Sequence, residues 1–207
     1  MSRRLLAALR RWRVRPPWRA LFERDDGQIV SLDCETSSLE VAKAELLSVA
    51  AVKIDGRRIA ASAAFHVLVR PESAPDNDNV RIHGLRPKEL RAGMPPEDAL
   101  RALLGFIEGR TLLGYYLEYD AAILNKYLKP MIGVPLPNRQ IEISSRYHAW
   151  RQRLHPGAYT DLRWDAMIHR LGIPALPRHD ALNDAITTAM MYLSLAERAR
   201  RSAFQYK

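Results

Sequence analysis

The order of the predicted elements indicates a mixed α/β fold, in which helices flank a central five-stranded sheet. Three strands come first, and helices and strands then alternate to the end of the chain. This order is typical of a mixed sheet with helices packed on it. The composition fits one globular domain, because 47% of the 207 residues are hydrophobic and 27% are charged.

Three apolar segments predict the first strands. The first begins near Gln28, the second spans residues 46–54 and the third spans residues 59–69. The dipeptide Asp55-Gly56, between the second and third segments, is a hairpin signal. We therefore expect these three strands to be antiparallel neighbours.

Capping and turn residues delimit the elements of the second half. Proline at a helix start, aspartate at a cap and glycine at a helix end are the signals. The predicted elements are a helix from Pro95 to Gly109, a strand at 111–115, a helix from Asp120 to about Lys129, a strand at 139–143, a helix capped by Asp161 and ended by Gly172, and a helix from Asp180 to about Arg200. The two strands bring the sheet to five.

Positive charge is concentrated at the N-terminus. Residues 1–24 hold eight arginines and one acid, Glu23, and so carry seven of the nine net positive charges. Apolar residues recur there at helical spacing up to Pro16, which predicts a basic amphipathic extension, 1–24, before a domain at 25–207. Two interpretations are open: the extension binds nucleic acid, acidic lipid or a partner, or its apolar stripe packs on its own domain.

The single cysteine, Cys34, excludes an intrachain disulfide and gives no sign of an oxidising compartment. The apolar run at residues 5–9 is too short for a signal peptide or a membrane span. We therefore expect a cytoplasmic protein with no transmembrane segment.

Two carboxylates lie close together on the first predicted strand. Asp33 and Glu35 are two residues apart, so the strand period places both on one face and Cys34 on the other. The pair can share a metal ion. Taken alone, such a pair is also typical of a strand end or of a solvated edge.

Two later segments add three more candidates. Asp120 follows the predicted strand at 111–115, where a helix cap is the simpler interpretation. His179 lies in a loop, and Asp184 follows one turn into the last helix, among alanines and an isoleucine. An unpaired buried carboxylate is costly, so Asp184 needs a neutralising group there. The alternative is a capping Asp180, a surface His179 and a partly exposed Asp184.

Together these segments resemble the motifs of the DEDDh (DnaQ-like) 3′–5′ exonucleases, the family typified by the epsilon subunit of bacterial DNA polymerase III. The resemblance covers about residues 28–200. Residues 33–39, DCETSSL, resemble D-x-E-T-T-G-L; residues 114–120, GYYLEYD, resemble G-H-N-x-x-F-D; residues 179–184, HDALND, resemble H-x-A-x-x-D. Residues 82–85, IHGL, and the segment 162–173 are also similar to the family, and the order of all segments agrees.

The resemblance implies a ribonuclease H-like fold and a 3′–5′ exonuclease that cleaves single-stranded DNA to nucleoside 5′-monophosphates. It implies two metal ions held by Asp33, Glu35, Asp120 and Asp184, with Asp33 bridging them, and His179 as general base. Ligands that are all oxygen favour Mg²⁺ or Mn²⁺, and two such ions stabilise both the attacking and the leaving oxygen. A histidine suits the role of general base, since the usual pKa of its imidazole lies near working pH.

The resemblance also implies contacts with the substrate. Thr36 would contact the 3′ end, Leu39 would form an apolar wedge between the last bases, and His83 would border the same pocket. The expected partner is the 3′ end of a single strand, DNA rather than RNA, together with a polymerase or another protein; no oligomeric state is implied.

The sequence departs from the family motifs without losing a catalytic residue. Tyr115 and Tyr116 replace His-Asn, Tyr119 replaces Phe, and Ser38 replaces Gly. We expect Tyr115 and Tyr116 to pack in the core. Glu142, near a position where the family often has aspartate, is assigned no catalytic role.

Two alternatives remain beside the DNA exonuclease. An RNA-directed 3′–5′ exoribonuclease would share the catalytic group, because the 2′-hydroxyl is recognised elsewhere. A catalytically silent nucleic-acid-binding or assembly protein would keep the fold, and loss of Asp33 would then change nothing.

Overall fold

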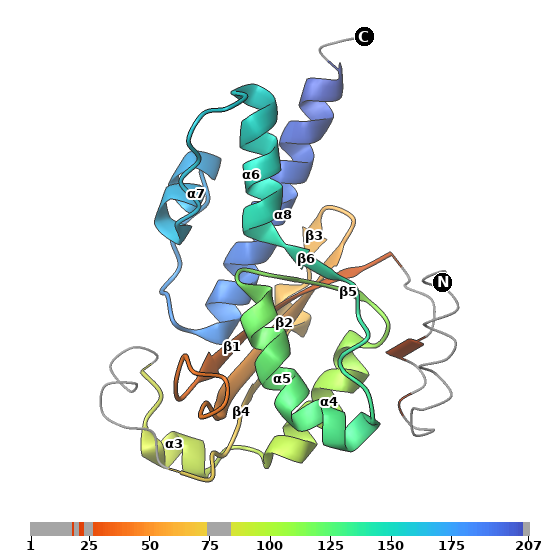
Figure 1. Ribbon diagram of the computed structural model, residues 1–207, viewed down its shortest axis with the longest axis vertical. Coiled ribbons are helices and arrows are strands. Elements are labelled where there is room, and N and C mark those ends of the chain that lie inside the picture. Colours follow the sequence, from red (N-terminus) through yellow and green to blue (C-terminus); the bar gives the residue numbers. More distant parts are fainter. Residues whose placement is uncertain (1–17, 19–20, 23–26, 74–83, 205–207) are drawn as a thin grey trace.

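A six-stranded mixed sheet forms the centre of the molecule, and helices cover both of its faces (Figure 1). The computed structural model describes residues 18, 21–22, 27–73 and 84–204. Of these, residues 202–204 are described through their backbone only. The strands are β1 (Ile29–Thr36), β2 (Leu46–Asp55), β3 (Arg58–Ile59), β4 (Phe65–Leu68), β5 (Thr111–Gly114) and β6 (Gln140–Glu142). The helices are α3 (Pro87–Arg91), α4 (Pro96–Ile107), α5 (Leu117–Ile132), α6 (Ile143–Leu154), α7 (Trp164–Leu171) and α8 (Ala181–Phe204), with a 3₁₀ turn, η2 (Ala61–Ala63).

Strand β1 lies in the middle of the sheet. The order is β3-β2-β1-β5-β6, and β4 pairs with β2. Strand β1 is antiparallel to β2 and parallel to β5, which is in turn parallel to β6. The carboxyl ends of β1, β5 and β6 therefore meet at one edge of the sheet. The mixed α/β class and the antiparallel start are confirmed.

The sheet has six strands rather than five because the predicted third strand is divided. Strands β3 and β4 pair with successive parts of β2, and η2 separates them. The interruption falls on the run Ala60-Ala61-Ser62-Ala63-Ala64. Alanine is depleted in strands because its small side chain gains little from packing on a pleated surface.

Each face of the sheet has its own hydrophobic core. Val30 and Leu32 of β1 join the core under α4 and α5, whereas Leu113 of β5 joins the core under α6, α7 and α8. The period of two along β1 thus directs alternate side chains to opposite helical layers. Asp33 and Glu35 fall on the α8 side, and Cys34 packs against the α4–α5 core.

Several predicted helix boundaries differ from the structure. Helix α5 begins at Leu117, three residues before Asp120, so Asp120 lies inside the first turns and does not cap the helix. The residue at the N-cap of α7 is Arg163, and Asp161 instead accepts a hydrogen bond from the Arg163 N–H. Neither α3 nor α6 was predicted.

The described part of the N-terminal segment lies against the α4–α5 core. Leu21 is buried, and Trp18 and Phe22 pack beside it. The predicted amphipathic helix at 5–16 lies outside the described residues, and the domain boundary after residue 24 stays a prediction. No helix among the described residues is long and apolar enough to cross a bilayer.

Candidate active site

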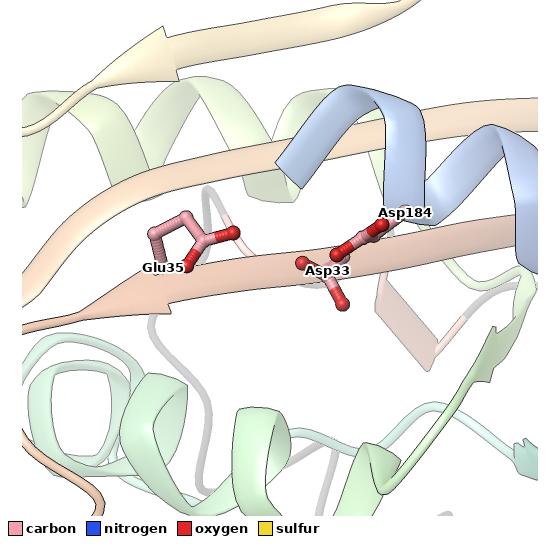
Figure 2. Close-up of side chains that lie close together, drawn as sticks. All are labelled: Asp33, Glu35 and Asp184. Atoms are coloured by element: carbon pink, nitrogen blue, oxygen red, sulfur yellow. The ribbon is translucent and has the colours of Figure 1, made fainter. Parts of the chain in front are cut away.

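Three carboxylates meet where the end of β1 faces the start of α8 (Figure 2). Asp33 and Glu35 come from β1, and Asp184 comes from the first turns of α8. One oxygen from each lies within 4.8 Å of the other two, and all three side chains are half-buried. The predicted placement of Asp33 and Glu35 on one face is therefore found, and Asp184 completes the group.

A β-bulge shapes this end of the strand. Glu35 pairs with Ser48, but Thr36 pairs with Leu46, so the register of β1 and β2 shifts between Glu35 and Thr36. A bulge bends the strand and redirects the side chains next to it, and bulges are common beside active sites. The irregularity lies between the acidic pair and Thr36, the predicted substrate contact.

Burial and mutual repulsion disfavour the ionised forms of the cluster. Burial is the main reason that the pKa of Asp33 lies well above its usual value, and Asp120, Glu35 and Asp184 raise it further. Burial, followed by the charges of Asp184 and Asp180, raises the pKa of Glu35 to about 8. Burial also raises the pKa of Asp184, although a hydrogen bond from the His179 N–H partly opposes this.

Asp120 approaches β1 from the opposite layer. It lies on α5, is buried, and accepts hydrogen bonds from the thiol and the backbone N–H of Cys34. Burial raises its pKa, and the bonds from Cys34 lower it. Asp120 and the Asp33 group both line one cavity, so the β1 end is acidic on both faces.

The turn between β5 and α5 sets the position of Asp120. A Cβ atom at Gly114 would lie 2.8 Å from Cδ1 of Leu117, so only glycine permits this close return of the chain. Glu142 then accepts a hydrogen bond from the Leu117 N–H at 3.0 Å, at the first residue of α5. Glu142 is also the N-cap residue of α6, and its other carboxylate oxygen accepts hydrogen bonds from the N–H and Oγ of Ser144.

His179 lies in the loop before α8 and lines the same cavity. Its backbone is in the left-handed region, with φ of 59°, and its N–H donates to Oδ2 of Asp184 at 3.1 Å. The backbone of His179 thus helps to hold Asp184, while the imidazole is exposed. Asp180 caps α8 by accepting a hydrogen bond from the Asn183 N–H at 2.9 Å.

A hydroxyl network joins the end of β1 to α5. Oγ1 of Thr36 lies 2.7 Å from the phenol oxygen of Tyr119 and 3.1 Å from the carbonyl oxygen of Ser38. The phenol of Tyr119 also donates to that carbonyl. Tyr119 therefore fixes Thr36 and the loop that leads to Leu39 against the helix that carries Asp120.

The cavity has a volume of about 630 Å³, within the usual range for small-ligand sites. All five predicted catalytic residues line it, as do Thr36 and Leu39. Leu39 is 89% exposed, so it is not a core residue, and its predicted role as a wedge between bases stays a prediction. His83 lies outside the described residues.

The prediction for the two adjacent tyrosines is half wrong. Tyr115 packs against Trp164, with ring centroids 5.1 Å apart, and donates to the carbonyl oxygen of Leu162. Tyr116 is 59% exposed and lines the cavity, because its backbone turns into the left-handed region and carries the ring out of the core.

The donor set fits a hard divalent cation. Among the described residues, no lysine or arginine forms an ion pair with Asp33, Glu35, Asp120 or Asp184. Buried carboxylates without such partners are stabilised by metal ions, and oxygen ligands select Mg²⁺ or Mn²⁺ over softer metals. The acidic group and its raised pKa values therefore match a metal-binding site.

The supporting residues of the site were only weakly indicated by sequence patterns. The phenol of Tyr119 at an apolar motif position was the one visible sign of the Thr36 network. The double role of Glu142 had no sign in the sequence, since it depends on β6 ending beside the start of α5.

The fold and sequence of the chain match known nucleases. The family model RNase_T, described as Exonuclease, matches residues 30–192. E. coli Exonuclease I in complex with a dT13 oligonucleotide superposes with a TM-score of 0.70 at 18% identity, over 86% of this chain and 43% of that one. This similarity supports the ribonuclease H-like fold.

Curated relatives belong to DNA polymerase III systems. The chain is 26% identical over 176 residues to the PolC-type DNA polymerase III of Thermotoga maritima, covering 85% of this chain but only 12% of that polymerase. It is 25% identical over 173 residues to the DNA polymerase III subunit epsilon of Aquifex aeolicus, covering 83% of this chain and 82% of the subunit. With the family model matching 30–192, the chain belongs to the exonuclease family, and the resemblance to the DnaQ-like members is confirmed.

Proposed function

We propose that the chain is a metal-dependent 3′–5′ exonuclease that removes nucleoside 5′-monophosphates from the 3′ end of single-stranded DNA. The observation that carries this proposal is the meeting of Asp33, Glu35 and Asp184 within 4.8 Å, in a cavity that Asp120 and His179 also line. Four carboxylates in one cavity suit a phosphodiester substrate only when cations neutralise them.

Asp33, Glu35, Asp120 and Asp184 would hold two Mg²⁺ or Mn²⁺ ions. When bound, such ions stabilise the attacking and leaving oxygens and lower the pKa of a water molecule. One oxygen each of Asp33, Glu35 and Asp184 lies within 4.8 Å of the other two, so these three carboxylates would form the centre of the metal site. Asp120, which lines the same cavity from the opposite layer, would add a further carboxylate ligand.

His179 would accept the proton of the attacking water. Its exposed imidazole lines the cavity, while its backbone N–H is fixed on Asp184. The water oxygen attacks phosphorus, and the bond from phosphorus to O3′ of the preceding nucleotide breaks. The phosphate stays on the 5′ side of the released nucleotide, and the leaving O3′ takes a proton from solvent, so that the shortened strand ends in a 3′-hydroxyl.

Thr36 and Leu39 would hold the 3′-terminal nucleotide. The Thr36 hydroxyl is fixed by Tyr119 and Ser38, and the exposed Leu39 follows it in the same cavity. An exposed apolar side chain beside a polar anchor suits a strand end whose last bases can unstack.

The test is degradation of 5′-labelled single strands of DNA and RNA of equal sequence, with Mg²⁺, Mn²⁺ or a chelator. We expect a metal-dependent ladder that shortens from the 3′ end, faster on DNA, and absent in Asp33→Asn. Asp98→Asn, an exposed aspartate on the first turn of α4, is the matched control and should match the wild type.

Each alternative predicts a different outcome in this assay. Faster cleavage of RNA would identify an exoribonuclease. If the wild type and Asp33→Asn both bind the strands but neither cuts them with any of the metals, the chain is a binding protein and the catalytic proposal is refuted.

We infer that the setting is proofreading or repair, in contact with a polymerase or another protein. The relatives named as epsilon subunit and PolC-type polymerase support this inference. A primer-template with a mismatched 3′ end should be shortened faster than a matched one, since frayed ends reach a single-strand site more readily. Equal rates on both would contradict the proofreading inference.

A further inference from the structure

Tyr116 is a large aromatic side chain left exposed at the mouth of the site. It is 59% exposed and lines the cavity together with Leu39 and the carboxylates. Leu39 follows β1 and Tyr116 follows β5, and these two strands are parallel neighbours. The two exposed apolar residues therefore lie at the same sheet edge as Asp33 and Glu35.

The backbone of Tyr116 is in a conformation that disfavours tyrosine. Its φ and ψ are 56° and 35°, in the left-handed region, where asparagine and glycine are accommodated more easily than bulky residues. The family motif has asparagine at this place. Tyr116 is the N-cap residue of α5, yet its side chain makes no capping hydrogen bond.

The side chain thus contributes neither a cap nor core burial to offset this conformational cost. Backbone conformations of this kind cluster at active sites and ligand-binding sites. The exposed part of the ring faces solvent and the cavity. A ligand bound in the cavity is therefore the group that the ring could contact.

The ring is supported from behind by a packed aromatic group. Tyr115 meets Tyr116 edge-to-face, with centroids 4.6 Å apart and an interplanar angle of 66°. Tyr115 is in turn held by Trp164, at 5.1 Å and 69°, and by its hydrogen bond to the Leu162 carbonyl. Such edge-to-face contacts limit ring motion and keep the outer ring in place before a ligand arrives.

We propose that Tyr116 stacks on one of the two nucleobases that flank the scissile phosphate. Aromatic side chains bind single strands in this way without strong sequence preference, because every base has a π-face. The proposal rests on the proposed function, since it places a strand end in the cavity. It adds a substrate-binding residue to Thr36 and Leu39.

The test combines variants of Tyr116 with strands that lack a base. Binding is measured with Mg²⁺ present, so that the carboxylates are neutralised, and with a labelled single-stranded DNA decamer whose 3′-terminal linkages are uncleavable analogues, so that no strand is cut. Tyr116→Asn should weaken binding by roughly 5- to 100-fold, the range for loss of one stacked base, and Tyr116→Phe should stay within about twofold. With abasic residues at the last two positions, the wild type and Tyr116→Asn should bind equally.

Stability separates stacking from a structural role. Tyr116→Asn should melt at the same or a higher temperature, since asparagine suits the left-handed region. A lower melting temperature would remove the argument from conformational cost and overturn the proposal. Equal binding of the wild type and Tyr116→Asn to the ordinary decamer, or an undiminished difference on the abasic strand, would also overturn it.

Failure of the proposed function would look different. Metal-dependent shortening of DNA by the wild type tests that function directly and does not depend on Tyr116. A wild type that shortens DNA while Tyr116→Asn binds normally refutes stacking alone.

Discussion

At the scale of single residues, the site disfavours the ionised form of its carboxylates, and a bound cation would reverse this. Glu35 shows this most directly, because burial and the neighbouring carboxylates raise its pKa from 4.5 to about 8. The folded chain therefore holds a proton that the unfolded chain releases near pH 4.5. Between these two values the folded state binds more protons than the unfolded state.

This proton difference fixes the sign of a pH effect on stability. The contribution of Glu35 is fully present below about pH 4.5 and is lost as pH rises through about 8. In chelator, the Tm of the wild type should therefore fall more steeply over this window than the Tm of Glu35→Gln. Thermal melts at intervals between pH 4.5 and 8.5 measure both slopes.

Glu118→Gln is the control for this experiment, since Glu118 is exposed at the same cavity and should leave the wild-type slope unchanged. Added Mg²⁺ should reduce the difference between the wild type and Glu35→Gln, because a bound cation favours the ionised form. Identical slopes for those two proteins in chelator would contradict the prediction.

Tyr119 gives a second prediction at this scale. Tyr119→Phe keeps the ring and removes the hydroxyl that contacts Thr36 Oγ1 and the Ser38 carbonyl. Loss of one such network costs about 1 kcal/mol, and we expect it mainly as a rise of about 2- to 10-fold in KM for single-stranded DNA, with kcat changed less. Steady-state kinetics on one oligonucleotide separates the two constants.

Tyr127→Phe is a matched control on the same helix. The Tyr127 phenol accepts a hydrogen bond from the Leu46 N–H at 3.2 Å and does not line the cavity. Its loss should lower Tm without changing KM. If Tyr127→Phe raised KM as much as Tyr119→Phe, the effect would come from general loosening of α5.

The residues that bear the metal-binding pattern were predictable, whereas those that support them were not. Asp33, Glu35 and Asp184 are placed by strand period and helix position, both of which are local properties. The exposure of Tyr116 depends on one positive φ, and the Tyr119 contact joins residues 83 positions apart in the chain. Neither leaves a periodic pattern in the sequence.

At the scale of elements, Glu142 connects two helices to the site. Its carboxylate accepts one hydrogen bond from the Leu117 N–H at the start of α5 and another from the Ser144 N–H at the start of α6. Glu142→Ala should cost about 1–2 kcal/mol of stability, as for loss of a helix cap. Because α5 carries Asp120, kcat should fall as well, and Glu142→Gln should lie between the wild type and Glu142→Ala in both measurements.

A hydrogen bond before another helix, outside the site, provides the comparison. Asp161 accepts a hydrogen bond from the Arg163 N–H before α7 and is not among the residues that line the cavity. Asp161→Ala should lower Tm and leave kcat unchanged. A proportional loss of kcat in both alanine variants would assign the effect of Glu142→Ala to stability alone.

The elements missed from the sequence have weak apolar patterns. Helix α6 buries only Ile143 and Tyr147 among its twelve residues, so its period is faint. Helix α4, with five buried residues in twelve, was predicted to within two residues of its observed end. Amphipathic strength, rather than helix length, decided which helices could be recognised.

At the scale of the whole molecule, the positive charge is concentrated in one segment of the sequence. The formal net charge is +9, and residues 1–24 carry most of it, while the cavity is acidic. Leu21 is buried against the α4–α5 core, so removal of the complete segment would uncover core surface. Deletion of residues 1–16 removes six arginines and leaves Trp18, Leu21 and Phe22 in place.

We expect this deletion to weaken the salt dependence of DNA binding. Each phosphate contact on a single strand contributes about 0.7 to the slope of log K against log salt. If the six arginines contact phosphates, the slope should fall by up to about 4, whereas kcat on a short oligonucleotide should stay the same because the carboxylates are untouched. A full-length variant with these arginines changed to lysine keeps the charge and should retain the slope. An unchanged slope after deletion would contradict phosphate binding and leave a lipid, a protein partner or packing on the domain itself. Sedimentation with anionic vesicles tests for lipid, and a lower Tm after deletion would indicate packing on the domain.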